Sequence, residues 1–224
     1  MKVKFIDKMG SDLSVVNAAR VSFSKTSEWE SITPAGPIEG LLSKQDEKLI
    51  NYLAKHNHWS PFGHASMQFH IKAPVFVARQ LVKHQVGLVW NEVSRRYVDD
   101  EVEFYVPEEW RGAPENSKQG SSSEVIDINP HHRMVDDYQS VCKTAKWTYE
   151  YLLGRGVAPE QARMVLPQSM MTEWYWSGTL MAFARVCNLR CKPDTQLETQ
   201  VVANQIDEVG EEYFPVSWKA LRDG

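Results

Sequence analysis

The chain has 224 residues, of which 42% are hydrophobic and 24% charged, and its formal net charge is −4. This length suits one hydrophobic core and no Pro/Gly/Ser-rich linker divides the chain, so we expect a single domain over residues 1–224. The acidic balance argues against a protein that coats nucleic acid, and no apolar run of about 18 residues is present to cross a bilayer.

The N-terminal segment carries Asp7 where a signal peptide would need an apolar region, so export is not expected. The three cysteines are an odd number and do not form a disulfide framework. We therefore expect a cytoplasmic protein with no membrane partner.

The first part of the chain alternates between strand and helix patterns. Weak alternation predicts a strand over residues 2–6, and Ser11 then caps a helix. A loop over residues 24–42 precedes a second helix over residues 43–55.

The middle of the chain predicts a half-buried strand over residues 66–72, with Met67, Phe69 and Ile71 on its buried face. Pro74 can open a helix that continues to His84. In that helix Arg79 and Lys83 would share a face, and the apolar residues 86–90 that follow favour a turn or a strand.

The second half of the chain is mostly helical in pattern. It predicts a loop over residues 111–130 and a long helix over 135–152. A short helix from Pro159 holds Arg163 and stops at Pro167, and an apolar helix covers 177–190. The last helix starts with a capping box at Thr195 and Glu198. Long helices mixed with several strands, without regular βαβ alternation, predict the α+β class.

Residues 79–97 contain the densest group of chemically active side chains in the chain. Cations, a histidine, an acid, amides and a serine surround the short apolar stretch, and such a group can hold a charged, planar ligand. A solvated basic helix followed by an edge strand is the simplest alternative. Arg163, Arg185 and Arg190 recur in similarly apolar surroundings, and buried arginines need anionic partners.

Other motifs are weaker. The histidines His56, His58, His64 and His70 match no zinc-binding spacing, and Cys187 and Cys191, one helical turn apart, lack a matched second pair, so we expect no metal. Gly154-Arg155-Gly156 follows a helix and lacks the third glycine of a dinucleotide fingerprint. Neither a Walker A sequence nor a nucleophile elbow is present.

The 79–97 segment resembles flavin-dependent thymidylate synthases, whose signature is Arg-His-Arg, seven residues and then Ser. Here the corresponding residues are Lys83-His84-Gln85, eight residues and then Ser94. Further matching stretches occur in the family's order, at 12–23, 55–62, 104–107, 162–167 and 188–190. Residues 24–42 and 111–130 show no such match and are expected to be variable loops.

The resemblance implies a single-domain subunit with an antiparallel sheet flanked by long helices. It also implies a homotetramer with active sites between subunits, in which NADPH reduces FAD and dUMP is converted to dTMP with methylene-tetrahydrofolate as the carbon donor. Cysteine-dependent thymidylate synthases activate uracil C5 by attack of a thiolate on C6. The cysteines of this chain lack the neighbours expected of an activated thiol.

By similarity, Arg190 is the catalytic residue: its permanent charge and fixed fork of donors can stabilise an ionised uracil ring at N3 and O4. Ser94 is expected to bind and position the nucleotide and not to act as a nucleophile. The expected dUMP contacts are Gln80, Lys83, Glu92, Val93, Ser94, Arg95, Arg96, Arg163 and Arg190.

The family also implies flavin contacts. Those expected from matching motifs are His58, Ser60, Lys83, His84, Gln85 and Glu92. In the family an Asn-Ala-Arg run with a further Asn holds flavin as well; Thr179-Leu180-Met181 and Arg185 stand at those positions, so Thr179 and Arg185 complete the expected set.

The departures from the family have physical consequences. Lys83 keeps a charge without the planar fork and Gln85 has no charge, so anion binding there should be weaker or rebalanced by Arg185. The extra residue before Ser94 requires a bulge or a longer turn. Such changes would suit a viral branch of the family, for which the host cytoplasm is the expected location.

Two alternative functions remain open. One is a non-catalytic nucleotide-binding protein on the same fold, which the Lys83/Gln85 pair would permit. The other is a structural or nucleic-acid-binding α+β protein that uses its arginines on phosphates, which the acidic net charge disfavours.

Overall fold

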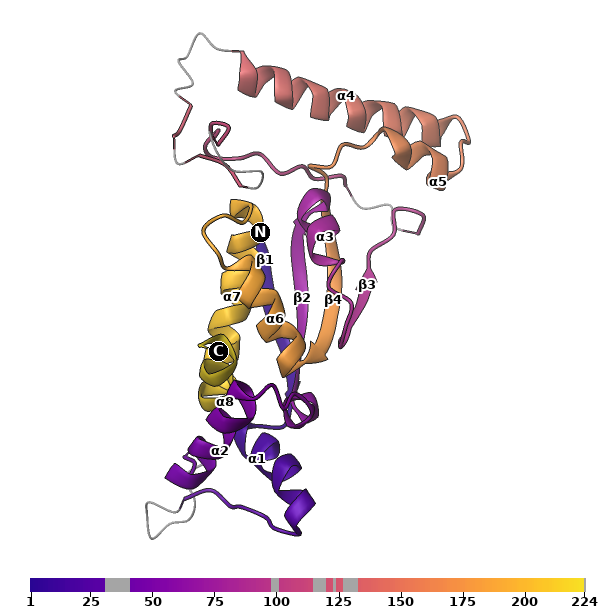
Figure 1. The fold of residues 1–224 in the computed structure, drawn as a ribbon. Helices are drawn as coiled ribbons and strands as arrows, with labels where there is room; N and C mark the ends of the chain where they lie inside the picture. The colour runs from indigo at the N-terminus through magenta and orange to yellow at the C-terminus, as the bar shows by residue number, and fades with distance from the viewer. Residues whose placement is uncertain (31–40, 98–100, 115–119, 123, 127–132, 224) are drawn as a thin grey trace.

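The computed structural model describes residues 1–30, 41–97, 101–114, 120–122, 124–126 and 133–223. These residues form a four-stranded antiparallel sheet of order β1-β2-β4-β3, with helices against the sheet and at both ends of the molecule (Figure 1). The predicted α+β class and the antiparallel sheet flanked by helices are confirmed.

The element bounds are as follows. The strands are β1 (Lys2–Met9), β2 (Ser66–Pro74), β3 (Leu88–Glu92) and β4 (Met171–Thr179). The α-helices are α1 (Asp12–Arg20), α2 (Lys44–Lys55), α3 (Val75–Leu81), α4 (Met134–Gly154), α5 (Pro159–Ala162), α6 (Leu180–Arg190), α7 (Leu197–Tyr213) and α8 (Pro215–Arg222). Short 3₁₀ turns are η1 (Val21–Phe23), η2 (Ser60–His64) and η3 (Arg163–Val165).

The two inner strands, β2 and β4, pair without a register shift from Ser66 opposite Thr179 to Pro74 opposite Met171. The face of β2 that alternation predicted is buried, since Met67, Phe69 and Ile71 are at most 1% exposed. Helices α6, α7 and α8 lie together beside the sheet, α4 crosses one end of the molecule, and α1 and α2 lie at the other (Figure 1).

The sequence analysis did not predict β4, and the helix predicted over 177–190 was wrong in its first three residues. Thr179 ends the strand and is the N-cap of α6, where its Oγ1 accepts a hydrogen bond from the Ala182 N–H at 3.2 Å. Thr172, Trp174 and Trp176 are buried on alternate positions, which is the period of a strand. That alternation was the signal available in the sequence.

Aromatic side chains of the sheet and α6 fill the centre of the main core. Phe183 of α6 meets Phe69 and Trp176 edge to face, with ring centroids 5.1 and 5.2 Å apart. A second, smaller cluster gathers Val102, Tyr149 and Ala162 where α4 and α5 meet. The sheet and α6 therefore form one rigid block, and α4 with α5 packs around a separate apolar centre.

Several predicted helix ends need correction. The helix predicted to reach His84 ends at Leu81, so Lys83 lies beyond it and does not share a helical face with Arg79. The predicted capping box was wrong, because Gln196 is the N-cap of α7 and the Thr195 hydroxyl donates to the Leu189 carbonyl. The predicted last helix, α7, continues to Tyr213; the chain then turns at Phe214, and Pro215 starts α8, which was not predicted.

Other predictions hold. Ser11 is the N-cap of α1, and Ser43 caps α2 by accepting from the Asp46 N–H at 3.2 Å. The long helix and the short helical turns at 159–165 are present, although Val141 of α4 is 61% exposed. The predicted loops over 24–42 and 111–130 lie partly outside the described residues.

Among the helices described here, none combines the length and apolar character needed to cross a bilayer.

Gly210 gives a test of the packing between α7 and α8. A Cβ at this position would lie 2.3 Å from the Trp218 ring. We therefore expect Gly210→Ala to lower the free energy of unfolding by about 2 kcal/mol, despite the better helix propensity of Ala, because the buried indole has to shift.

The measurement is urea denaturation followed by tryptophan fluorescence. Gly154→Ala is the matched control, because Gly154 is also helical and a Cβ there meets nothing within 4 Å. Equal stability of the two variants would contradict the packing.

Candidate active site

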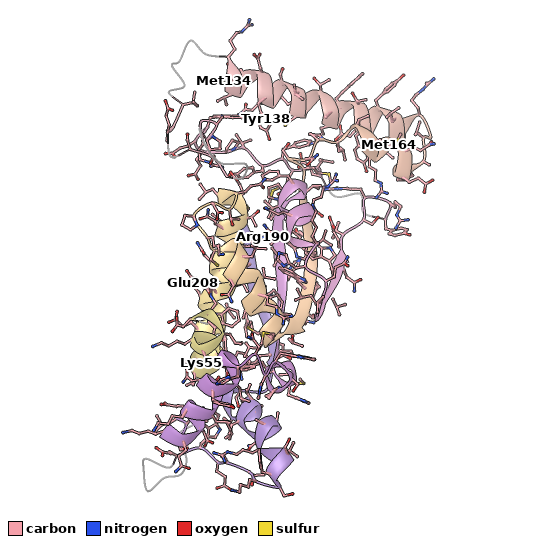
Figure 2. The ribbon with its side chains drawn as sticks, in the orientation of Figure 1. Lys55, Met134, Tyr138, Met164, Arg190 and Glu208 are labelled. Carbon is pink, nitrogen blue, oxygen red and sulfur yellow. The ribbon has the colours of Figure 1, made fainter. Side chains whose placement is uncertain are left out.

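Arg190 and His84 form a hydrogen-bonded pair between α6 and the turn after α3. The Arg190 Nε donates to the His84 Nε2 at 3.1 Å. Arg190 is the last residue of α6, and Figure 2 labels it in the half of the molecule nearer α4. Two residues that the motifs predicted, 106 positions apart in the sequence, are therefore in contact.

The electrostatics of the pair follow from partial burial. Burial, together with the positive charge of Arg190, lowers the pKa of His84 below its usual value of 6.5. Burial also lowers the pKa of the Arg190 guanidinium, which nevertheless stays protonated at neutral pH. The pair is thus a fixed cation beside a neutral imidazole.

Gln80 is held by a residue that the sequence analysis did not single out. The hydroxyl of Thr199, which is fully buried on α7, donates to the Gln80 Oε1 at 2.5 Å. Because its carbonyl oxygen is used in this way, Gln80 presents its NH₂ group as the end available to a ligand.

A cavity of about 410 Å³, here called the Arg163 cavity, lies between α3, β3 and η3. Its volume is that of a small-molecule site. Four predicted dUMP contacts line this cavity, namely Glu92, Val93, Arg95 and Arg163. Arg79, which was not predicted as a contact, lines it as well. Three arginines around one cavity favour a phosphorylated or carboxylated ligand.

Glu92 is held at the wall of this cavity by two donors. The hydroxyl of Thr172 donates to its Oε1 at 2.8 Å, and the Trp90 indole N–H donates to its Oε2 at 3.3 Å. Thr172 comes from the neighbouring strand β4 and Trp90 from β3 itself, so the carboxylate has a fixed direction before any ligand binds.

The segment after β3 also places Ser94 and Arg96. The Ser94 Oγ accepts from the Arg96 Nε at 3.1 Å, and both residues follow Val93, which is 45% exposed. Arg95 turns toward the Arg163 cavity and its Nη2 donates to the Glu101 carbonyl at 3.4 Å. In β3 the register with β4 is regular, so β3 itself contains no bulge, and Gly87 just before it has a positive φ of 76°.

A larger cavity of about 760 Å³, here called the Trp59 cavity, lies between α1, α2 and η2. It contains the predicted flavin contacts His58 and Ser60. Tyr52 and Trp59 line it as well, and their side chains are 53% and 59% exposed. A wide cavity with exposed aromatic rings is suited to a flat ligand.

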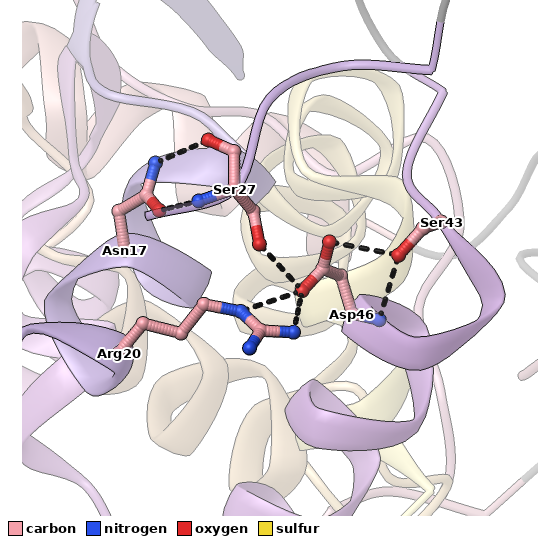
Figure 3. Close-up of polar contacts among 5 residues, drawn as sticks. All are labelled: Asn17, Arg20, Ser27, Ser43 and Asp46. Carbon is pink, nitrogen blue, oxygen red and sulfur yellow. Dashed lines mark hydrogen bonds and ion pairs between the residues drawn. The ribbon is translucent and has the colours of Figure 1, made fainter. Parts of the chain in front are cut away.

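A buried carboxylate network shapes one wall of the Trp59 cavity (Figure 3). Asp46 accepts hydrogen bonds from the Arg20 Nε at 2.9 Å and Nη2 at 2.5 Å, and from the hydroxyls of Ser27 and Ser43 at 3.0 and 2.8 Å. The Asn17 side chain both donates to and accepts from the Ser27 backbone. These bonds tie the chain after η1 to α1 and α2, and Arg20 itself lines the cavity.

The remaining predicted flavin contacts lie outside the two cavities. The side chains of Lys83, Gln85 and Arg185 are exposed, and Thr179 uses its hydroxyl as the cap of α6. Within one chain, therefore, the predicted residues fall into the Arg163 cavity, the Arg190–His84 pair with Gln80, the Trp59 cavity, and these separate positions.

The cysteines require one correction. Cys142 and Cys187 are buried, and burial raises the pKa of the Cys187 thiol. Cys191, the C-cap of α6, was predicted to lack activating neighbours, but a hydrogen bond from Cys187 lowers its pKa. Within the described ranges, no group of three or more His, Cys, Asp or Glu side chains has a metal-binding arrangement.

Comparison with known proteins places the chain in a family. Residues 4–216 match the family model described as "Thymidylate synthase complementing protein". The chain is 36% identical over 221 residues to a flavin-dependent thymidylate synthase of Thermus thermophilus, covering 99% of this chain and 75% of that protein. It is 38% identical over 222 residues to a protein of the same name from Kosmotoga olearia, covering 98% and 89% of the two chains.

A solved structure is similar over the same length. It is a UMP/dUMP methylase, PolB from Streptomyces cacaoi, bound with 5-Br dUMP, with a TM-score of 0.78, 31% identity, and coverage of 99% of this chain and 94% of PolB. The chain belongs to the flavin-dependent thymidylate synthase family and is an enzyme of that family. The family resemblance found in the motifs is confirmed.

Asp46 gives a test of the network at the Trp59 cavity. Burial raises the pKa of this carboxyl, but the hydrogen bonds from Arg20, Ser43 and Ser27 outweigh it, and the pKa is lowered from its usual 3.8. A lowered pKa means that the carboxylate stabilises the fold above pH 3.8 and loses this effect as pH falls through the folded-state pKa. We expect Asp46→Asn to lower the free energy of unfolding by about 2–3 kcal/mol at pH 7.

The measurement is denaturant unfolding from pH 7 down to pH 3, with Glu47→Gln as a control that removes the same charge one residue later. The difference between wild type and Asp46→Asn should shrink at the acid end. A difference that does not change with pH would contradict the role of the charge.

Proposed function

We propose that the chain catalyses the complete reductive methylation of dUMP to dTMP, with methylene-tetrahydrofolate as carbon donor, FAD as the bound hydride carrier and NADPH as its reductant. The observation that carries this proposal is the match with flavin-dependent thymidylate synthases over 98–99% of the chain. The arginine-lined cavity and the Arg190–His84 pair supply the chemistry that such a substrate requires.

Methylation needs electron density at uracil C5, and this chain has no thiol placed for attack on C6. Cys142 and Cys187 are buried, and Cys191 is the C-cap of α6, with its thiol in a hydrogen bond with the Cys187 thiol. The uracil is therefore polarised by charge. Arg190 has two Nη groups in a fixed fork, which can bind N3 and O4 and stabilise the ionised ring.

The phosphate and sugar of dUMP suit the Arg163 cavity. Arg79, Arg95 and Arg163 offer charge-assisted hydrogen bonds to an anion, and Glu92 can accept from a sugar hydroxyl. Glu92 is already held by Thr172 and Trp90, so little side-chain freedom is lost when the nucleotide binds.

The residues around the Trp59 cavity fit a flavin. His58 and Ser60 would bind it, and Trp59 and Tyr52 offer aromatic faces to its ring system. Bound FAD supplies the hydride that completes the new methyl group. The protein side chains bind the ring and, by lining the cavity, keep water from the reacting atoms.

The arrangement within one chain supports a homotetramer with shared sites. Arg190 is not among the residues that line the Arg163 cavity, and His58 and Ser60 belong to a third location. A second subunit that presents its own Arg190 or Trp59 cavity would bring these groups together around one nucleotide. The exposed side chains of Lys83, Gln85 and Arg185 would then be available to ligands at such a junction.

UMP is a second candidate substrate. PolB, the UMP/dUMP methylase, has also been solved with 5-Br UMP, and that structure matches this chain with a TM-score of 0.77 over 99% of its length. Both nucleotides present the same uracil and phosphate, so the ribose 2′-hydroxyl alone distinguishes them.

The function is tested by an anaerobic assay of the purified protein with FAD, NADPH and methylene-tetrahydrofolate, in parallel with dUMP and with UMP. We expect NADPH to bleach the flavin, and its colour to return only when nucleotide and folate are both present, with dTMP appearing by chromatography. Nucleotide and flavin binding without a methylated product would instead support a non-catalytic nucleotide-binding protein.

Arg190→Ala is the matched negative variant for this assay, and we expect it to lower dTMP formation by on the order of 10³-fold. Flavin content and subunit number should stay near those of wild type, because the last residue of α6 is at the end of its helix. Arg155→Ala, at the exposed C-cap of α4, removes the same charge at a residue that lines neither the Arg163 cavity nor the Trp59 cavity. Undiminished turnover in Arg190→Ala would remove Arg190 from the mechanism.

Thr199 gives a separate prediction about Gln80. Thr199→Val removes the hydroxyl that fixes the Gln80 carbonyl, so the amide can turn its oxygen toward the nucleotide. We expect the KM for dUMP to rise roughly tenfold, with a smaller change in kcat, and Thr199→Ser to restore it. A wild-type KM in Thr199→Val would show that Thr199 does not orient Gln80.

A further inference from the structure

We propose that His84 is a positioning residue of the reaction, whose neutral imidazole accepts a hydrogen bond from the Arg190 Nε and aims both Nη groups at the uracil. This inference rests on the proposed function, because it specifies how Arg190 is held for the step assigned to it. The contact that carries it is the 3.1 Å hydrogen bond between the two side chains.

The donor and acceptor of this hydrogen bond define the protonation state of the His84 imidazole. A guanidinium nitrogen can only donate, so the His84 Nε2 has to offer a lone pair. The ring is therefore neutral, with its proton on Nδ1. A protonated ring would have N–H groups on both nitrogens and would lose the bond to Arg190.

The same hydrogen bond sets the orientation of the Arg190 guanidinium. Among the residues that the structure describes, His84 is the only hydrogen-bond partner of the Arg190 side chain. Because this bond uses Nε, both Nη groups remain available on the far side of the fork. That pair of donors is what N3 and O4 of an ionised uracil require.

Rigid elements hold both members of the pair. The backbone N–H of His84 donates to the backbone carbonyl of Leu81 at 3.0 Å, so the turn continues directly from α3. Leu81, Val186 and Cys187 have no exposed surface, which fixes the ends of α3 and α6 in the main core. The distance between the two side chains is thus set by the fold.

The neighbours of His84 in the sequence have a different environment. The side chains of Lys83 and Gln85 are exposed, whereas His84 points inward and is partly buried. The family motif assigns all three residues to the flavin. Here the central residue is already engaged with Arg190, so its main contact is with the catalytic arginine.

The environment of the pair keeps the imidazole neutral. Burial and Arg190 of α6 both lower the pKa of His84, and Lys83 is the adjacent charged residue on its own turn. No acid among the described residues contributes to this shift. Half of the imidazole is therefore protonated only at a pH below 6.5, and the bond to Arg190 is lost as pH falls through the pKa of the folded state.

Two variants separate this role from a purely structural one. His84→Leu removes the acceptor, whereas His84→Gln keeps an acceptor oxygen that does not titrate. His64→Gln is the matched control, because His64 is an exposed histidine of η2 outside the proposed site. Flavin content and circular dichroism establish that each variant is folded.

The first measurement uses dUMP alone. Ionisation of N3 changes the ultraviolet absorbance of uracil, so a difference spectrum of holoenzyme with dUMP reports the effect of Arg190 without turnover. We expect His84→Leu to lose most of this signal and His84→Gln to retain it. Steady-state kinetics should show kcat/KM for dUMP reduced by on the order of 10²-fold in His84→Leu.

The second measurement is the pH profile of kcat/KM between pH 5 and 8. Wild type and His64→Gln should lose activity at the acid end, whereas His84→Gln should lack this inflection. The proposal is overturned if His84→Leu keeps the ionisation signal, if both His84 variants lose it equally, or if the inflection persists in His84→Gln. Turnover by the wild-type protein tests the proposed function separately. A failure of that function can therefore be distinguished from a failure of the role proposed for His84.

Discussion

The antiparallel pairing of β2 with β4 is the constraint on which the other parts of the molecule depend. Each of these strands runs directly into a helix, β2 into α3 and β4 into α6. Because the strands are antiparallel, the two helices start at opposite ends of the sheet and approach one another from opposite directions. Their C-terminal ends meet at His84 and Arg190, and β3, paired on the other side of β4, carries Glu92 to the Arg163 cavity. A change of register between β2 and β4 would therefore separate the residues to which the proposed function assigns the reaction.

Arg190 places its charge at the end of an apolar helix. Arg190 ends a helix whose residues Phe183, Val186 and Cys187 are fully buried, so the guanidinium is at the boundary of the core and partly desolvated. Its partner is a neutral imidazole and not a carboxylate, which leaves the positive charge uncompensated and available to an anionic ring. Of the three arginines of the Arg163 cavity, Arg79 and Arg163 are exposed, whereas Arg95 is half-buried like Arg190. In the proposed function, the half-buried Arg190 contacts the uracil, and the exposed Arg79 and Arg163 bind the phosphate.

The departures from the family signature fall on exposed positions. Lys83 and Gln85 flank His84 on the surface of the turn, so neither change disturbs the core or the bond to Arg190. Gly87, whose positive φ of 76° permits a tight turn, lies just before β3, and β3 then pairs with β4 in regular register. In the structure, the changed residues are therefore compatible with an intact site, and their effect is confined to ligands or subunits that reach the surface there.

The sequence alone determined the family, the class of fold and most individual helices, because signature residues, caps and apolar periodicity are local features. It also identified Arg190, His84 and the residues of the Arg163 cavity as chemically important, through motifs that were read in order along the chain. Tertiary structure decided what these residues contact. The strand β4 was missed and its end was interpreted as helix, although Gly178 lies there, because the β2 residues that pair with Ser177 to Thr179 are more than 100 residues away. Thr199, which fixes Gln80, and the acceptor role of His84 depend on contacts between distant segments, and no local pattern contains them.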